Sequence, residues 1–365
     1  MPSKAAISLH RFHAYPDAMH NESGSSAPPR PSLAVGLIVF VLVFVASAVA
    51  LCFEAELPYL YGRAAAVVFV ITAGPLLVLA HEGGHYAVAR LIGWRVALFT
   101  WGGYTIRLRP WRIRHGAPPF SDAWGAVVAV PTQESRWGYI AVFAGGPAAN
   151  LAIALLSAVT ASALETEAAA FFWLLAALSL LAGVTNLFPW RKGSDGAQIV
   201  SILGERDLTA RTLMARLAEQ MIGEVRPRDW PPSLMQSAMR LTLWTPYSVL
   251  LLLLYVWHMD RGEVDAARRI WLRTGDDSEV ICERAFFSAF VDGDAQGADG
   301  LLTRAGADPS CLRFWRAKAA IAVQQNDFPL AREAIRMARI IAGRDPYATV
   351  WDREVLDQLE LRCTA

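Results

Sequence analysis

Four apolar segments, each long enough to cross a lipid bilayer, limit this 365-residue chain to the folds of membrane proteins. They cover residues 32–52, 64–93, 137–161 and 168–188. Hydrophobic residues make up 54% of the sequence, which is more than an average soluble protein contains. The sequence therefore predicts a mainly α-helical, polytopic membrane protein with about four transmembrane helices.

The first apolar segment has two interpretations. Residues 1–31 are rich in Ser, Pro, His and Gly, so we expect a disordered cytoplasmic tail. The stretch from Ala46 to Ala48 resembles a cleavage site, so segment 32–52 is either a cleaved signal peptide or a retained anchor. The long tail that precedes it favours the retained anchor.

Charges in the loops predict the orientation of the chain. Basic residues precede the first segment, gather between the second and third, and follow the fourth, whereas the opposite loops contain one basic residue, Arg63. Loops rich in Lys and Arg stay on the cytoplasmic side. We therefore expect a multi-pass protein with both termini in the cytoplasm, in the cell membrane.

Net charge and cysteine content exclude two further classes. The net charge of +1 argues against a surface that binds nucleic acid. The four cysteines are scattered and form no Cys-x-x-Cys pair, so neither a disulfide framework nor a cysteine zinc site is indicated.

The second apolar segment contains ionisable residues that require an explanation. The stretch "LVLAHEGGHYAVARLIG" places His81, Glu82 and His85 in an otherwise apolar helix, where unpaired charges are costly. Two histidines four residues apart lie on one face of a helix and can bind one metal ion. In this His-Glu-x-x-His pattern, zinc lowers the pKa of a water molecule and the glutamate takes its proton. Histidines that are merely hydrogen-bonded are the alternative, which leaves Glu82 unexplained.

Two histidines make an incomplete metal site, so another ligand is expected from a different helix. After the fourth segment, Pro189 ends the helix and Gly196 lets the backbone turn. Asp195 can therefore fold back toward the histidines. The alternative role of Asp195 is the N-cap of a helix over 196–203, and the two roles are compatible.

Three motifs in this order resemble the signatures of the site-2 protease family of intramembrane zinc metalloproteases. They are "HEGGH" at residue 81, "FAGGPAANLAIAL" around Asn150, and Asn186 followed by Pro189 and the Asp-Gly pair at 195. The resemblance covers about residues 64–203. It implies three ligands for Zn²⁺, namely His81, His85 and Asp195. It further implies that Glu82 is the general base and that Asn150 and Asn186 bind the substrate.

The loop between the second and third apolar segments has β character. "GGYTIRLRP" alternates apolar and polar residues, and "WGAVVAVP" is a second β-rich run. We expect a small hairpin or sheet, with an irregular loop as the alternative. A free strand edge there could hold an unwound substrate through backbone pairing.

The C-terminal third of the chain differs from the membrane part. The apolar stretch in "WTPYSVLLLLLYVWHMD" is closer to a dozen residues than to twenty, which favours a buried helix of a soluble domain over a fifth span. Three later stretches align with a period slightly above thirty residues: "MDRGEVDAARRIW", "FVDGDAQGADGLL" and "VQQNDFPLAREAI". They align Gly262, Gly293 and Asn326 as turns, each followed after five residues by an alanine, at 267, 298 and 331.

This period resembles tetratricopeptide-type helical repeats, which form concave surfaces for peptides or protein partners. An irregular helical bundle is the alternative. The expected domains are a tail (1–31), a membrane-embedded metalloprotease domain (32–203), a linker region (204–244) and a cytoplasmic helical-repeat domain (245–365) that is a candidate site for a protein partner.

The combined features predict a zinc metalloendopeptidase that cleaves a membrane-anchored protein substrate in or near its transmembrane segment, in regulated proteolysis. Two alternatives come from other classes: a catalytically silent receptor or chaperone for transmembrane helices, and a membrane-anchored repeat scaffold. Glu82 favours the enzyme, because neither alternative needs a base beside the metal.

Overall fold

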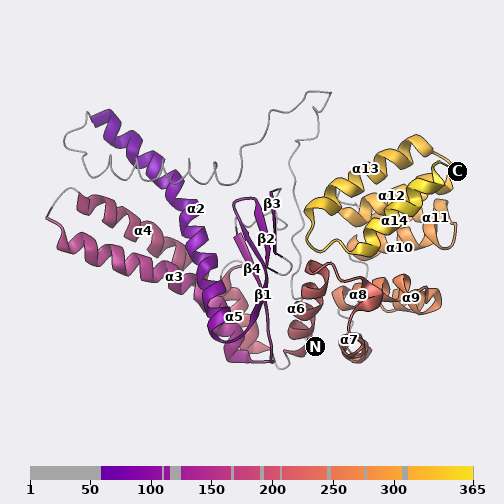
Figure 1. Cartoon of the computed structure of the whole chain (residues 1–365), viewed down its shortest axis with the longest axis horizontal. Coiled ribbons are helices and arrows are strands. Elements are labelled where there is room, and N and C mark those ends of the chain that lie inside the picture. The colour runs from indigo at the N-terminus through magenta and orange to yellow at the C-terminus, as the bar shows by residue number, and fades with distance from the viewer. Residues whose placement is uncertain are drawn as a thin grey trace. The chain divides into compact units, whose positions relative to one another are not determined.

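Figure 1 shows the computed structural model of the chain. It describes residues 59–108, 111–115, 125–165, 168–189, 193–205, 208–244, 248–274, 278–305 and 311–364. Among these, 59–104 and 125–205 form one compact unit, and 105–115 and 208–364 form a second. The predicted tail and the first apolar segment, 1–52, lie outside the described residues.

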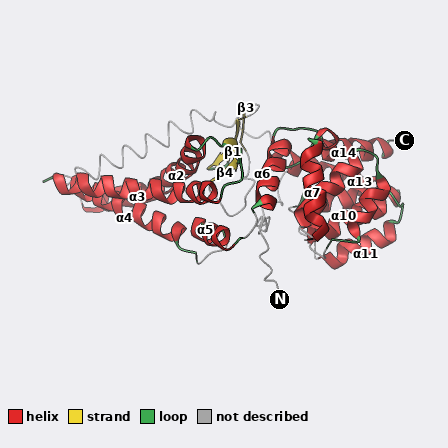
Figure 2. Cartoon of the chain, turned by 90° about the horizontal axis from the view of Figure 1, so that it is seen from below, coloured by secondary structure: helices red, strands yellow, loops and turns green. Residues whose placement is uncertain are grey.

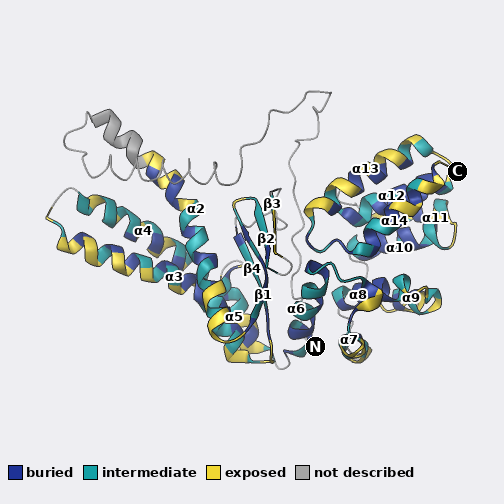
Figure 3. Ribbon diagram, in the orientation of Figure 1, coloured by how far each residue is buried: buried dark blue, intermediate teal, exposed yellow. Residues whose placement is uncertain are grey.

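Three helices of the first unit are long and apolar enough to cross a membrane. They are α2 (Tyr59–Leu91), α3 (Arg136–Ala163) and α4 (Ala168–Leu187), and they coincide with the second, third and fourth predicted segments. Large apolar side chains along α3 and α4 are exposed (Figure 3), as lipid-facing residues are: Leu155, Leu156, Val159, Leu180 and Leu181. The mainly helical fold with membrane-length helices is confirmed (Figure 2).

Two glycines allow α2 and α3 to pack closely. A Cβ atom on Gly84 would overlap the carbonyl oxygen of Gly145, and a Cβ atom on Gly145 would lie 2.8 Å from the carbonyl oxygen of Gly84. Small residues of this kind let membrane helices approach at backbone distance. Gly84 therefore has a packing role, whereas a Cβ atom on the neighbouring Gly83 would have nothing within 4 Å.

A four-stranded sheet lies between α2 and α3 in the sequence, which confirms the predicted β element. Its strands are β1 (Arg95–Trp101), β2 (Tyr104–Leu108), β3 (Trp111–His115) and β4 (Gly125–Val130), in the order β3-β2-β1-β4. β1 and β4 are antiparallel, with Trp101 opposite Gly125. β4 is thus an edge strand in the part of the sheet that the structure describes.

The second unit contains the helices that follow α5 (Asp195–Gly204) in the sequence. They are α6 (Thr209–Ile222), the 3₁₀ helix η2 (Pro227–Asp229), α7 (Pro232–Trp244), α8 (Ser248–Asp260), α9 (Val264–Trp271), α10 (Ser278–Phe290), α11 (Ala295–Ala305), α12 (Leu312–Gln324), α13 (Phe328–Arg344) and α14 (Val350–Arg362). The region 204–244, expected as a linker, contains α6 and α7. Pro227 and Pro232 stand at helix starts, where proline is favoured, so a helical region resembles a linker in sequence.

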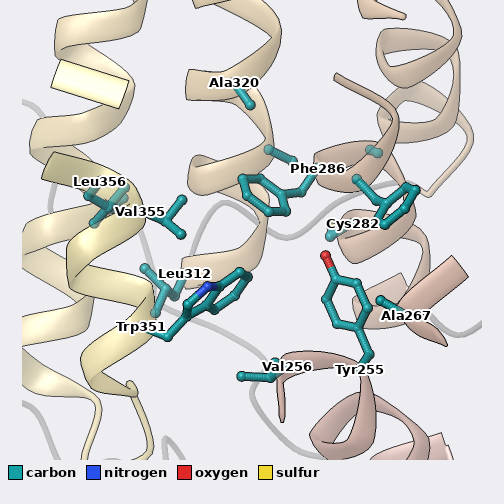
Figure 4. Packing of buried hydrophobic residues seen from close by; sticks show 14 of the residues in the cluster. Tyr255, Val256, Ala267, Cys282, Phe286, Leu312, Ala320, Trp351, Val355 and Leu356 are labelled. Carbon is teal, nitrogen blue, oxygen red and sulfur yellow. The ribbon is translucent and has the colours of Figure 1, made fainter. Parts of the chain in front are cut away.

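The apolar helix α8 lies in the core of the second unit. Every residue from Leu250 to Trp257 is buried. Figure 4 shows Tyr255 of this helix among Phe286 and Trp351, which come from α10 and α14. These contacts and its length of 13 residues favour the buried-helix interpretation over a fifth span.

Three helix pairs in this unit, α8–α9, α10–α11 and α12–α13, share one turn geometry. The aligned turn residues Gly262, Gly293 and Asn326 have φ angles of 74°, 73° and 58°. The alanines five residues later are all fully buried: Ala267, Ala298 and Ala331. Left-handed backbone favours Gly and Asn, so the sequence periodicity marks structurally equivalent turns.

Arg316 of α12 is fully buried between two acidic side chains. It donates hydrogen bonds to Glu283 of α10 and Asp352 of α14. Its guanidinium also lies 4.6 Å from the ring centre of Phe286 and 4.7 Å from that of Trp351. Arg316 therefore joins carboxylates from two other helices in the core, and Glu283 also pairs with Arg313 at 3.1 Å.

We expect Arg316→Met to lower the free energy of unfolding of the second unit by about 3–5 kcal/mol, because it removes the buried cation that pairs with Asp352 and shares Glu283 with Arg313. Tryptophan fluorescence of the full-length protein in detergent, titrated with denaturant, measures this change. The matched control is Arg339→Met, which breaks exposed ion pairs with Asp357 and Glu360 and should cost less than about 1 kcal/mol. Equal effects of the two substitutions would contradict the prediction.

Candidate metal centre

The three predicted metal ligands lie together in the first unit. His81 and His85 are one turn apart on α2, and Asp195 is the first residue of α5 (Asp195–Gly204). Nε2 of His81 lies 2.9 Å from Oδ2 of Asp195, and Nε2 of His85 lies 3.4 Å from Oδ1 of the same carboxylate. The two Nε2 atoms are 3.2 Å apart. Residues more than a hundred positions apart in the chain thus form one cluster of possible metal ligands.

The start of α5 directs the Asp195 carboxylate toward the histidines. The N-cap of this helix is Ser194, whose hydroxyl accepts a hydrogen bond from the Ala197 N–H and donates one to the Phe188 carbonyl. The alternative role of Asp195 as the N-cap is therefore wrong. Gly196 is also required here, because a Cβ atom would overlap the carbonyl oxygen of Leu187 at the end of α4.

The donor atoms fit a zinc ion. Two imidazole nitrogens and a carboxylate oxygen are typical zinc ligands, and ligand atoms around a tetrahedral zinc lie about 3.3 Å apart. The two Nε2 atoms, 3.2 Å apart, agree with that value, and each faces a different oxygen of Asp195, at 2.9 and 3.4 Å. One donor atom from each of the three residues lies within 4.8 Å of the others. Gly146 of α3 adds a second observation. A Cβ atom there would lie 2.6 Å from Nε2 of His81 and closer still to Nε2 of His85, so a glycine keeps the space beside both nitrogens open.

On each imidazole, the nitrogen Nδ1, which points away from Asp195, contacts α3. Nδ1 of His85 lies 2.6 Å from the carbonyl oxygen of Val142, and Nδ1 of His81 lies 3.3 Å from the side-chain amide of Asn150. Nδ1 of His85 also lies 3.3 Å from the Gly146 N–H, but its contact with the Val142 carbonyl is the shorter one and requires a proton on Nδ1. The lone pair of Nε2 is then free for a metal. Sequence reasoning missed Val142, because a backbone carbonyl leaves no signature in the residue type.

Glu82 is buried next to His81, and the edge strand β4 begins beside it. A Cβ atom on Gly125, the first residue of β4, would lie 2.5 Å from Cγ of Glu82 and 3.0 Å from its Oε1. In the sequence this glycine is one residue of a β-rich run, and its residue type indicates no role. Its position shows that the carboxylate of Glu82 and the strand edge are close neighbours.

The two predicted substrate-binding asparagines differ in position. Asn150 is 1% exposed and contacts His81. Asn186 donates a hydrogen bond to the Ala182 carbonyl within its own helix, and the described contacts do not include one between its side chain and the metal ligands. The role of both residues in substrate binding stays a prediction.

A buried His-His-carboxylate cluster with an adjacent glutamate, held by helices of membrane length, is the arrangement expected of a membrane-embedded metallopeptidase. Residues 68–166 match the model of Peptidase family M50, the site-2 protease family, which confirms the resemblance inferred from the sequence motifs. The matched region contains His81, Glu82 and His85 and ends before Asp195, whose placement rests on the geometry. Searches of curated proteins and of solved structures each found no match.

Proposed function

We propose that this protein is an intramembrane zinc endopeptidase that cleaves membrane-anchored proteins in or near their transmembrane segments. The observation that carries this proposal is the convergence of His81, His85 and Asp195 beside the buried Glu82, on helices apolar enough to lie in a membrane. The family match supports a metallopeptidase. Glu82→Gln, which removes the proposed base and keeps the metal ligands, is the experiment that tests it.

Each residue of the site has a distinct task in this proposal. His81, His85 and Asp195 hold the zinc ion, which supplies Lewis-acid chemistry when bound. Glu82 takes a proton from the attacking water and passes it to the leaving amine. Gly146 keeps the space beside the ligand nitrogens open, and the closely packed α2 and α3 exclude bulk water from the buried carboxylate.

The edge of β4 is the proposed binding site for the substrate backbone. A helical substrate hides its peptide bonds, so it must unwind before hydrolysis. An extended segment can pair with an edge strand through main-chain hydrogen bonds. Because Gly125 at the start of β4 lies against Glu82, a segment paired there would bring its peptide groups close to the proposed base.

The helical unit is proposed as a recruitment domain of tetratricopeptide type. The equivalent turns and buried alanines of its three helix pairs support this assignment. Stacked helix pairs present extended surfaces for peptides or proteins. A partner bound there would raise the local concentration of a substrate's cytoplasmic part, which fits regulated proteolysis.

A catalytically silent receptor for transmembrane helices is the second candidate. Family M50 includes some inactive members, so the family match by itself leaves this candidate open. Glu82 argues against it, because a receptor needs no buried carboxylate beside the metal ligands. Cleavage activity that depends on Glu82 separates the two candidates.

The basic loops predict a topology that reporter fusions can measure. We expect reporters fused after Gly116 and after Ala365 to report the cytoplasm, and one after Glu165 to report the opposite side, because Lys- and Arg-rich loops stay cytoplasmic. A reporter at Ala365 on the outside would mean that residues 248–260 cross the membrane. That result would contradict a cytoplasmic helical domain.

A further inference from the structure

One polar atom beside the metal ligands has no hydrogen-bond partner among the described residues. It is Oδ1 of Asn150, which is fully buried. The other end of the same amide, Nδ2, lies 3.3 Å from Nδ1 of His81. The amide thus presents its donor to His81 and leaves its acceptor unused.

This orientation is incompatible with a metal on His81. If the Asn150 NH₂ donates to Nδ1, a neutral His81 carries its own proton on Nε2, the atom that faces Asp195. A metal ligand needs a lone pair on Nε2, which moves the ring proton to Nδ1. Two donors would then face each other across 3.3 Å.

Turning the amide by half a rotation removes the conflict. The oxygen and nitrogen ends of an asparagine amide have nearly the same shape, and their assignment follows from the hydrogen-bond network. With the amide turned, Oδ1 accepts the Nδ1–H of His81. The NH₂ group then lies where Oδ1 lay and has no partner there. In return, the repulsion between two donors at His81 is replaced by a hydrogen bond from Nδ1–H to Oδ1.

We propose that Asn150 is a positioning residue for His81: its Oδ1 accepts the Nδ1–H group and thereby keeps Nε2 available to the metal. The Val142 carbonyl does the same for His85. Val142 and Asn150 are eight residues apart, about two turns of α3, so one face of this helix fixes both imidazoles. This inference rests on the proposed zinc site and adds a residue that holds it.

Two substitutions of Asn150 test the hydrogen bond. Asn150→Leu has a similar shape and no acceptor, so zinc affinity should fall about 10- to 100-fold, as on loss of other residues that hold metal ligands. Asn150→Asp has two acceptors and no donor, so it should keep zinc affinity within a few fold of wild type. Zinc affinity is measured on the purified full-length protein in detergent, by competition with a chelator.

The two variants together distinguish the two orientations of the amide. If the Asn150 NH₂ donated to Nδ1 of His81, its loss would free Nδ1 for the ring proton, and the leucine variant would bind zinc at least as tightly as wild type. Asn186→Leu is the matched control, because Asn186 bonds within α4 and its loss should leave zinc affinity unchanged. The absorption bands of bound Co²⁺ should show the same tetrahedral site in wild type and in Asn150→Asp.

The result that overturns the inference is wild-type zinc affinity in Asn150→Leu, or loss of zinc from a folded Asn150→Asp protein. Circular dichroism of the metal-free proteins establishes that each variant is folded. Absence of the proposed zinc site gives a different result, because wild type itself would then bind no zinc. Absence of proteolysis alone would leave the predicted zinc affinities of these variants unchanged.

Discussion

Replacing Gly146 with alanine is expected to empty the metal site. The new methyl group would lie 2.6 Å from Nε2 of His81 and closer still to Nε2 of His85, in the space that a metal bound to both nitrogens needs. Steric overlap with this methyl carbon would also push the two imidazole rings apart. We expect the purified variant to contain less than about a tenth of the zinc of wild type, and to lose proteolysis with it.

Gly83→Ala is the matched control for this prediction. Gly83 lies in the same His-Glu-x-x-His motif, and a Cβ atom there would meet nothing within 4 Å. Alanine also favours a helix over glycine by about 1 kcal/mol, so α2 should be at least as stable. Zinc content of both proteins is measured by atomic emission after the same purification. A full complement of zinc in Gly146→Ala would show that the metal binds elsewhere.

The membrane-length helices and the cluster of possible metal ligands could be predicted because simple physical rules determine them. Length and apolarity set the bounds of α3 and α4, and the sequence predicts them to within a few residues. The spacing of His81 and His85 places them on one helix face without any knowledge of the fold. The sequence predicts Asp195 as a metal ligand because Pro189 ends the preceding helix. The structure shows that Ser194, and not Asp195, is the N-cap of α5.

Other features depend on contacts that residue types do not encode. β1 lies outside the predicted β-rich runs. Its residues from Val96 to Leu98 are all buried, so it lacks the apolar–polar alternation that marks an exposed strand. The sequence does not distinguish Gly125 and Gly146 from other glycines. Their roles become visible only in the structure, where a side chain at either position would overlap residues of α2. The sequence of the region 204–244 resembles a linker because Pro227 and Pro232 stand at the starts of η2 and α7.

The second large effect concerns Glu82. Glu82→Gln keeps the size of the side chain, and so its packing against Gly125, but removes the group that accepts and returns a proton. General acid–base catalysis contributes about a hundredfold to ten-thousandfold, so proteolysis should fall by at least about a hundredfold. The ligands His81, His85 and Asp195 are untouched, and the variant should still hold about one zinc per chain.

This combination separates the base from the ligands. His81→Ala should lower zinc content and proteolysis together, because it removes an imidazole from the metal. Loss of zinc from Glu82→Gln would instead assign Glu82 to metal binding or to folding. Full activity of a zinc-loaded Glu82→Gln protein would show that another group moves the proton.

The central claim is that this site cleaves membrane proteins, and a comparison of cells producing wild type or Glu82→Gln tests it most directly. The measurement is the set of membrane-protein fragments, identified by mass spectrometry of their newly formed ends. We expect wild type to produce fragments that end in or beside transmembrane segments, and the same proteins to accumulate uncut with Glu82→Gln. Identical fragments at equal abundance in both cells would contradict the protease assignment and favour the silent receptor.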